Sequence, residues 1–190
     1  MIRYLFVLPL FFSCASLDYQ EIYQFTKSNL IGVSDIEINE DLIKKTKYSF
    51  IKVKIGKSKV AILPLSEIEN DVYKWVGSDA VIFTKNGRII KTIGLQYNLS
   101  MINKNNDEIF VNLHDPDAII SQKLELSSQD LVISGKNNYE EIKETFTTDQ
   151  FKWSGVNTFI RDKKSGLVFK STQEIHPRLN IISLDFVYVY

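Results

Sequence analysis

Apolar and polar positions alternate along most of this chain, which is the pattern of β-strands with one buried face. Ile51, Val53 and Ile55 would lie on one face of such a strand, and Lys52 and Lys54 would lie on the other. Further alternating or apolar runs follow at 59–65, 118–126, 142–148, 156–161, 167–173 and 180–190. Because most gaps are short and no strand–helix–strand rhythm is present, the pattern predicts a mainly β, single-domain protein with an antiparallel meander.

Two predicted turns separate strands in this pattern. The run DAVIFTKNGRIIKTIGL, residues 79–95, contains Asn86-Gly87 between two β-rich segments. A two-residue hairpin loop needs positive φ at both central positions, and Asn-Gly is the preferred pair there. Ser165-Gly166 predicts a second hairpin nearer the carboxyl end.

Ahead of the strands the spacing becomes helical. Residues 18–30 carry apolar side chains at the spacing of one helix face. Asp18 and Glu21, three positions apart, form a capping-box signature at the start of this segment. We therefore predict a short amino-terminal helix.

The first thirteen residues have the layout of an export signal. Arg3 precedes an apolar stretch at 4–12, and small residues follow at 13–16. Nine apolar residues are too few to cross a bilayer, which takes about 20 residues in a helix. We interpret residues 1–13 as a signal peptide.

Cys14, which directly follows this stretch, is the chain's single cysteine. A small residue followed by cysteine resembles a bacterial lipobox, although Phe11 stands where leucine is usual. The resemblance implies lipidation of Cys14, with palmitate as the kind of acyl group attached, and a tether at 14–17 before a domain at 18–190. Ala15 in place of aspartate favours the outer membrane. The alternative is an ordinary secretory signal with an incidental cysteine.

Composition restricts the function further. Lys and Arg number 23, as do Asp and Glu, so the near-neutral chain is not a general nucleic-acid binder. Hydrophobic residues make up 44% and aromatic residues 12%, which is enough for a packed core. With Cys14 in the tether, the domain at 18–190 has no thiol for a disulfide, a zinc site or a nucleophile.

Catalytic motifs are scarce. The sequence has no HExxH pair, nucleophile elbow, phosphate-binding loop or dinucleotide fingerprint. The strongest acidic candidate is His114-Asp115-Pro116-Asp117, which could bind a metal or act on a glycosidic bond through Asp115 and Asp117. Asp and Pro together more often form a turn, and we favour that interpretation.

Two surface hypotheses concern lysines and tryptophans. Seven lysines and no acidic residue stand between Lys44 and Lys59, so this strip could attract anionic lipid or acidic polysaccharide. A solvated hairpin face, with lysines guarding a strand edge, is the interpretation we favour. Trp75 and Trp153 could stack on sugar rings, but buried packing is the commoner role, and Trp153 is the nearer to a turn.

Two separated stretches resemble one family. SDAVIFTKNGRIIKTIGL, with Trp75 upstream, resembles the hairpin motif of the YjbF/GfcB lipoproteins, the group 4 capsule polysaccharide lipoprotein family. The carboxyl-terminal stretch VNTFIRDKKSGLVFKSTQEIHPRLNIISLDFVYV resembles that family's closing pattern. The residues that match this closing pattern are Asn157, Gly166, Ser171, Gln173, Pro177 and Leu179.

The resemblance implies an outer-membrane, periplasm-facing lipoprotein that serves capsule or exopolysaccharide production and export. Its implied fold is a large, strongly curved antiparallel sheet resembling an incomplete barrel. The resemblance brings no catalytic residue, metal or cofactor. We expect a non-enzymatic accessory that binds polysaccharide or an export-machinery protein, with Trp75, Arg88, Trp153 and Gln173 as candidate contacts. A polysaccharide-modifying hydrolase and a structural envelope lipoprotein without a glycan role are the alternatives.

Overall fold

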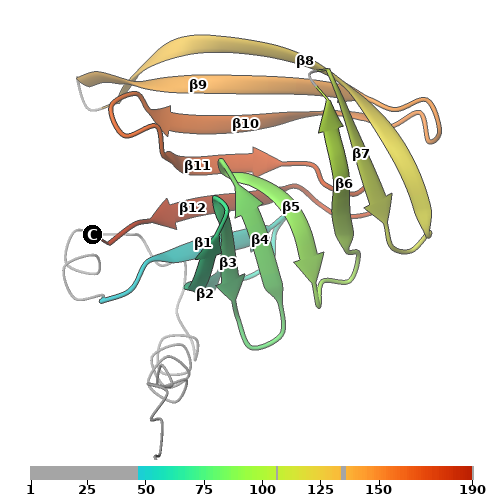
Figure 1. Ribbon diagram of the computed structural model, residues 1–190, viewed down its shortest axis with the longest axis horizontal. Coiled ribbons are helices and arrows are strands. Elements are labelled where there is room, and N and C mark those ends of the chain that lie inside the picture. Colours follow the sequence, from blue (N-terminus) through green and yellow to red (C-terminus); the bar gives the residue numbers. More distant parts are fainter. Residues whose placement is uncertain (1–46, 106, 134–135, 190) are drawn as a thin grey trace, which may run out of the picture.

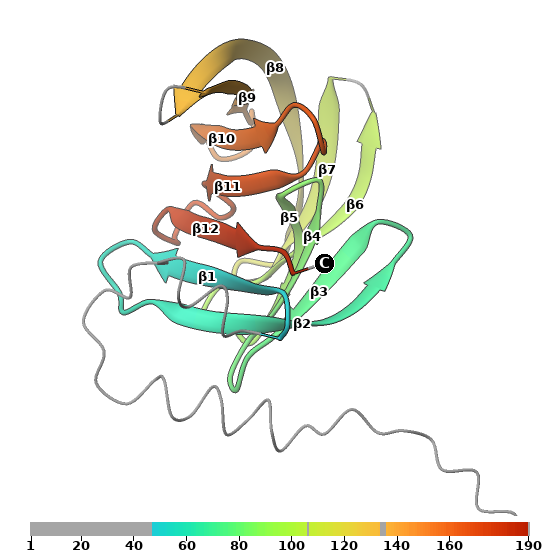
Figure 2. The ribbon, with the colours of Figure 1, turned by 90° about the vertical axis from the view of Figure 1, so that its left-hand side faces the viewer.

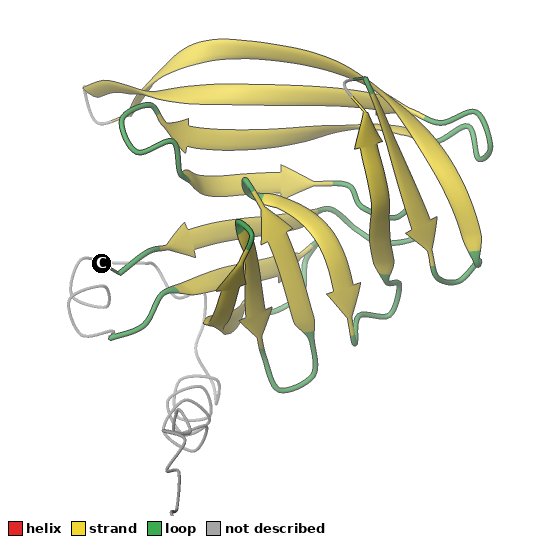
Figure 3. Ribbon diagram, viewed as in Figure 1, coloured by secondary structure: helices red, strands yellow, loops and turns green. Residues whose placement is uncertain are grey.

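The described residues form a closed antiparallel β-barrel. The computed structural model describes residues 47–105, 107–133 and 136–189. All of the regular structure in this part of the chain is strand (Figure 1, Figure 3). The strands are β1 (Phe50–Ile55), β2 (Ala61–Glu69), β3 (Val72–Val76), β4 (Val81–Lys85), β5 (Arg88–Ile93), β6 (Leu99–Asn105), β7 (Glu108–Leu113), β8 (Ala118–Ile133), β9 (Lys136–Thr147), β10 (Ser154–Asp162), β11 (Val168–Gln173) and β12 (Ile182–Val187).

The predicted antiparallel meander is confirmed, but the expected incomplete barrel is wrong because the sheet closes. Each strand pairs with its neighbours in the chain, and β12 returns to pair with β1. That last pairing runs in register from Phe50 opposite Val187 to Ile55 opposite Ile182. Closure satisfies the backbone donors and acceptors of both strands, which an open sheet would leave at its edges.

The barrel is flattened into two walls. In Figure 1, strands β8–β12 run across the view, while β3–β7 run steeply in front of them. Figure 2, turned by 90°, shows the same walls facing each other. Walls that cross in this way pack their inner side chains as two orthogonal sheets do.

A continuous apolar core fills most of the space between the walls. Its fully buried members include Trp75, Ile82, Leu113, Phe146 and Leu184, which come from strands of both walls. Side chains fill the interior of a barrel of about eight strands, and the interior widens as strands are added. Twelve strands therefore leave room for the cavity described below.

Both predicted hairpins are confirmed. Asn86 and Gly87 have φ values of 49° and 75° and connect β4 to β5, with Lys85 opposite Arg88. Ser165-Gly166 lies in the loop between β10 and β11. The Asp162 carboxylate accepts hydrogen bonds from the backbone N–H groups of that loop, and these bonds hold the pKa of Asp162 below its ordinary value.

The lysine face of the first strand differs from the prediction of a solvated edge. β1 pairs on one side with β12 and on the other with β2, so it is not an edge. Lys52 is buried, opposite Asp185 of β12 and Ile62 of β2, although Ile51 and Val53 do face the core as predicted. The alternation therefore gave the inward face correctly, but it did not show that the outward face is partly covered.

Several predictions lie outside the described residues. These are the signal peptide at 1–13, the lipid attachment at Cys14, the tether at 14–17, the helix at 18–30 and the lysines at 44 and 45. Among the described residues, no helix is long and apolar enough to cross a membrane.

Candidate functional site

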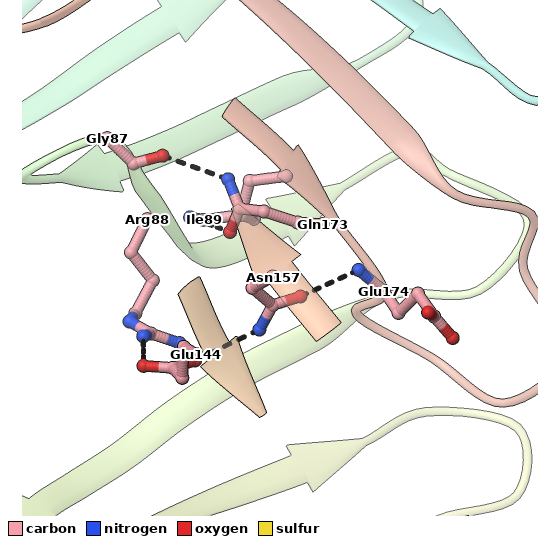
Figure 4. A network of polar contacts seen from close by, with 7 residues as sticks. All are labelled: Gly87, Arg88, Ile89, Glu144, Asn157, Gln173 and Glu174. Atoms are coloured by element: carbon pink, nitrogen blue, oxygen red, sulfur yellow. Dashed lines mark hydrogen bonds and ion pairs between the residues drawn. The ribbon is translucent and has the colours of Figure 1, made fainter. Parts of the chain in front are cut away.

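The two sequence stretches that resembled one family meet inside the barrel. The Gln173 side chain lies against the β4–β5 hairpin, where its Nε2 donates a hydrogen bond to the Gly87 carbonyl at 2.9 Å (Figure 4). Its Oε1 accepts from the Ile89 backbone N–H, also at 2.9 Å, and its Nε2 further donates to Ser171 Oγ. One buried amide therefore fastens the hairpin of one wall to β11 of the other.

An ion pair lies beside this contact. Arg88, the first residue after the hairpin turn, donates through Nη2 to Glu144 Oε2 on β9. The other carboxylate oxygen, Oε1, accepts from Asn157 Nδ2 at 3.0 Å, and Asn157 Oδ1 accepts from the Glu174 backbone N–H at 2.9 Å (Figure 4). Both oxygens of Glu144 are thus engaged. This geometry suits a counter-ion that orients Arg88 better than it suits a general base.

Arg88 also lines an open cavity of about 460 Å³, next to its ion pair with Glu144. Its polar wall also includes Lys85, Glu144 and Arg161. The apolar wall consists of Ile90, Met101, Leu126, Ile142, Phe159 and Val168. Pockets of about 300–1,000 Å³ with mainly apolar walls and a few convergent polar groups are typical of small-ligand sites.

Phe159 and Arg161 shape the side of the cavity formed by β10. The Arg88 Cζ lies 5.4 Å from the centre of the Phe159 ring, within the range of a cation–π contact. Arg161 Nη2 donates to Glu140 Oε2 at 2.5 Å, and this hydrogen bond holds the pKa of the Glu140 carboxyl below its ordinary value. The cationic side chains therefore have fixed orientations at the wall.

Of the four predicted contact residues, only Arg88 lines this cavity. Gln173 is buried and supports the hairpin. Trp75 is fully buried, stacks on Tyr73 with ring centres 5.8 Å apart, and donates through Nε1 to Thr84 Oγ1 at 2.8 Å. Trp75 has no free face for a sugar ring in this conformation, and the favoured prediction of buried packing is confirmed for it.

Trp153 is half-buried and also lies outside the cavity wall. It precedes β10 and packs edge-on against Phe146, with ring centres 4.7 Å apart. Its backbone carbonyl accepts a hydrogen bond from the Thr148 N–H, which closes the loop between β9 and β10. The structure therefore gives Trp153 a packing role at a turn, as its position in the sequence predicted.

The acidic stretch at 114–117 is a turn between β7 and β8, as the favoured interpretation predicted. Both aspartates project into solvent, with Asp115 paired to Arg178 at 3.3 Å and Asp117 paired to His114 at 3.6 Å. Neither lines the cavity. Within the described ranges no group of three or more His, Cys, Asp or Glu side chains could hold a metal ion.

Glu144 and Arg161 were missed by the sequence reasoning, although a signal existed. Ile142, Glu144 and Phe146 share the inward face of β9, so a charged residue stands in an apolar stripe. A buried carboxylate needs a cation or hydrogen-bond donors, because desolvation of an unpaired charge is costly. An acidic residue in such a stripe therefore indicates a cation elsewhere, but the pattern does not say which one.

His176, in the loop before β12, is buried away from this cavity. Its Nδ1 accepts a hydrogen bond from the Arg178 N–H at 3.1 Å, and its ring stacks on Tyr97 with centres 4.8 Å apart. Its Nε2 has no hydrogen-bond partner among the described residues. Burial lowers the pKa of His176, the positive charge of Arg178 lowers it further, and Asp115 partly opposes both.

We expect this histidine to make stability depend on pH. Because the folded pKa of His176 lies below the ordinary value of about 6.5, its contribution is complete above that pH and is lost as the pH falls toward the folded pKa. One proton gives a slope of at most about 1.4 kcal/mol per pH unit. Urea unfolding measured from pH 7.5 down to 5.5 should show stability falling below about pH 6.5 with a slope no steeper than this, and His176→Gln should reduce that slope. His114→Gln, at the other histidine, is the control, and equal slopes in both variants would contradict the assignment.

Comparison with known proteins identifies the family. A family model described as group 4 capsule polysaccharide lipoprotein gfcB, YjbF matches residues 23–129. The chain belongs to this family. The YjbF match includes the hairpin with Gly87 and Arg88 and ends before β9, so it contains only the hairpin side of the contacts shown in Figure 4.

A sequence comparison and a structure comparison extend the YjbF likeness over nearly the whole chain. The "uncharacterized lipoprotein GfcB" of Escherichia coli K12 is 23% identical over an alignment of 205 positions that covers 95% of each chain. The crystal structure of the hypothetical lipoprotein YmcC from Escherichia coli K12 superposes with a TM-score of 0.69 at 21% identity, covering 91% of this chain and 95% of that one. The family match supports a capsule-related lipoprotein of the cell envelope, and the structural likeness supports this barrel fold.

Proposed function

We propose that this YjbF-family lipoprotein is a non-enzymatic accessory of capsule or exopolysaccharide production and export, and that it binds saccharide in the cavity beside Arg88. The open cavity of about 460 Å³, with the Arg88–Glu144 ion pair in its wall, is the main support for this proposal. The capsule-related family supplies the context.

The cavity wall has both kinds of surface that a sugar needs. A sugar ring presents hydroxyl groups around its edge and C–H groups on its faces. Arg88 and Arg161 supply N–H donors, and Leu126 of β8 and Ile142 of β9 supply apolar contact. Few, oriented polar groups in a largely apolar wall are what gives a small-ligand site its specificity.

A binding role fits this wall better than hydrolysis. Most glycoside hydrolases place two carboxyl groups across the scissile bond, about 5–10 Å apart. The described part of the cavity wall contains one carboxylate, Glu144, and both of its oxygens are engaged by Arg88 and Asn157. Asp115 and Asp117, the residues of the hydrolase alternative, lie on an exposed turn outside the cavity.

The same proposal includes a lipid anchor at Cys14 and a periplasm-facing position at the outer membrane. The export signal and the lipoprotein names of the similar proteins support it. Radioactive palmitate should label the wild-type chain and leave Cys14→Ala unlabelled. Label that is absent, or that does not depend on Cys14, would refute the anchor without affecting the saccharide proposal.

Isothermal titration of the full chain in detergent, with the polysaccharide exported by the producing strain, tests saccharide binding. Leu126→Trp should fill the cavity without disturbing the fold, because that side chain is 59% exposed; we expect at least tenfold weaker binding. Ile119→Trp is the matched control, since Ile119 is 64% exposed on the same strand and faces outward.

Absence of both polysaccharide binding and a co-purifying export protein would refute the accessory role. Unchanged polymer export after deletion of the gene would favour the structural-lipoprotein alternative.

A further inference from the structure

The charges of the cavity wall are unequal. Lys85, Arg88 and Arg161 contribute three cationic side chains, and Glu144 is the one acidic side chain among the described lining residues. Lys85 has no carboxylate partner in the described part of the chain, and its Nζ donates to the Asn70 backbone carbonyl at 3.1 Å. Because Arg88 is paired with Glu144 and Arg161 with Glu140, Lys85 supplies the net positive charge of the cavity wall.

The orientation of the ion pairs strengthens this inequality. In the Arg88–Glu144 pair the arginine side chain is 14% exposed and the glutamate 1%. In the Arg161–Glu140 pair the exposed fractions are 41% and 21%. In both pairs the carboxylate is the more buried partner, so a ligand entering the cavity meets N–H groups before it meets acidic oxygens.

Arg88 also keeps donor capacity. A guanidinium carries five N–H donors, and the hydrogen bond to Glu144 occupies one of them. The remaining donors lie in a partly desolvated site, where a hydrogen bond to a charged acceptor is stronger than in water. A planar fork of donors of this kind matches a carboxylate.

We propose that the cavity selects an anionic sugar residue, with a carboxylate directed toward Lys85, Arg88 and Arg161. This assignment rests on the proposed saccharide-binding function and specifies its ligand class. Leu126 and Ile142 contact the C–H face of the same sugar. The wall is fixed by the hairpin contact to Gln173, so the cations are oriented before the ligand arrives.

The test compares two forms of one polymer on the full chain. The polysaccharide exported by the producing strain is titrated in its native form and after carbodiimide–borohydride reduction, which converts each uronic carboxyl to a neutral primary alcohol. The native form is expected to bind at least tenfold more tightly. Its affinity should fall as salt rises from 50 to 500 mM, because salt screens the attraction.

Substitutions locate the effect in the cavity. Lys85→Gln should weaken binding of the native polymer several-fold and that of the reduced polymer much less. Lys91→Gln, an exposed lysine of the same hairpin outside the cavity wall, should change neither. Equal affinity for both forms, or a native polymer that binds although it carries no acidic group, would overturn the anionic assignment and leave saccharide binding intact. Binding of neither form would refute both.

Discussion

Gly87→Ala is expected to lower the free energy of unfolding by about 2–5 kcal/mol, because two separate penalties add. Gly87 has a φ of +75°, where a residue with a Cβ costs about 1–2 kcal/mol. A Cβ built on it would also lie 2.5 Å from Val168 Cγ1, on the strand that the hairpin packs against. Overpacking of this kind costs typically about 1–3 kcal/mol. Urea unfolding of the full chain measures the change.

Gly166→Ala separates these two penalties. Gly166 has nearly the same φ, +74°, but no atom lies within 4 Å of a Cβ built there. Its substitution should therefore cost only the conformational part, about 1–2 kcal/mol. If the two alanine variants lost the same stability, the close approach of the hairpin to β11 would be wrong.

Glu144→Gln is expected to destabilise the protein by about 3–5 kcal/mol, the range found when one partner of a buried ion pair is removed. Glu144 is almost completely buried, and the substitution leaves Arg88 with a neutral amide in place of its carboxylate. Asn157 can still donate to the remaining carbonyl oxygen, so the loss reports mainly on the charge. Chemical unfolding at neutral pH gives the magnitude.

Glu140→Gln is the matched control, because it neutralises the more exposed ion pair with Arg161. An exposed pair contributes little to stability, so this variant should be nearly as stable as the wild type. The double variant Arg88→Met, Glu144→Gln should be less destabilised than the sum of its single substitutions, because neither charge is then left alone. Strict additivity would mean that the two residues are not coupled.

The sequence predicted the strands well where their signals are local. Alternation identified Ile51 and Val53 as core residues, and Asn86-Gly87 identified a hairpin whose geometry follows from positive φ at both positions. Closure of the barrel was not predictable in this way. It depends on Phe50 lying opposite Val187, and a period-two pattern carries no information about which distant strand is the partner.

The candidate site was predicted only in part, for a similar reason. Arg88, a residue of the hairpin motif, was one of the four predicted contacts, and it does border the cavity. Its partner Glu144 stands 56 positions away and was visible only as a charge on an apolar strand face. The tryptophans were candidates on residue type alone, and residue type does not reveal that Trp75 is enclosed by its neighbours. Burial and partner choice are properties of the closed barrel.

Hydrogen exchange of the full chain, with and without the exported polysaccharide, tests most directly whether the cavity is the binding site. Ligand contact and restricted opening slow the exchange of nearby backbone amides. Slower exchange is predicted for the hairpin at 85–90 and for the β10–β11 segment at 159–168, with the loop at 148–153 around Trp153 unchanged. Slower exchange around Trp153 without any change at 85–90 would contradict the account.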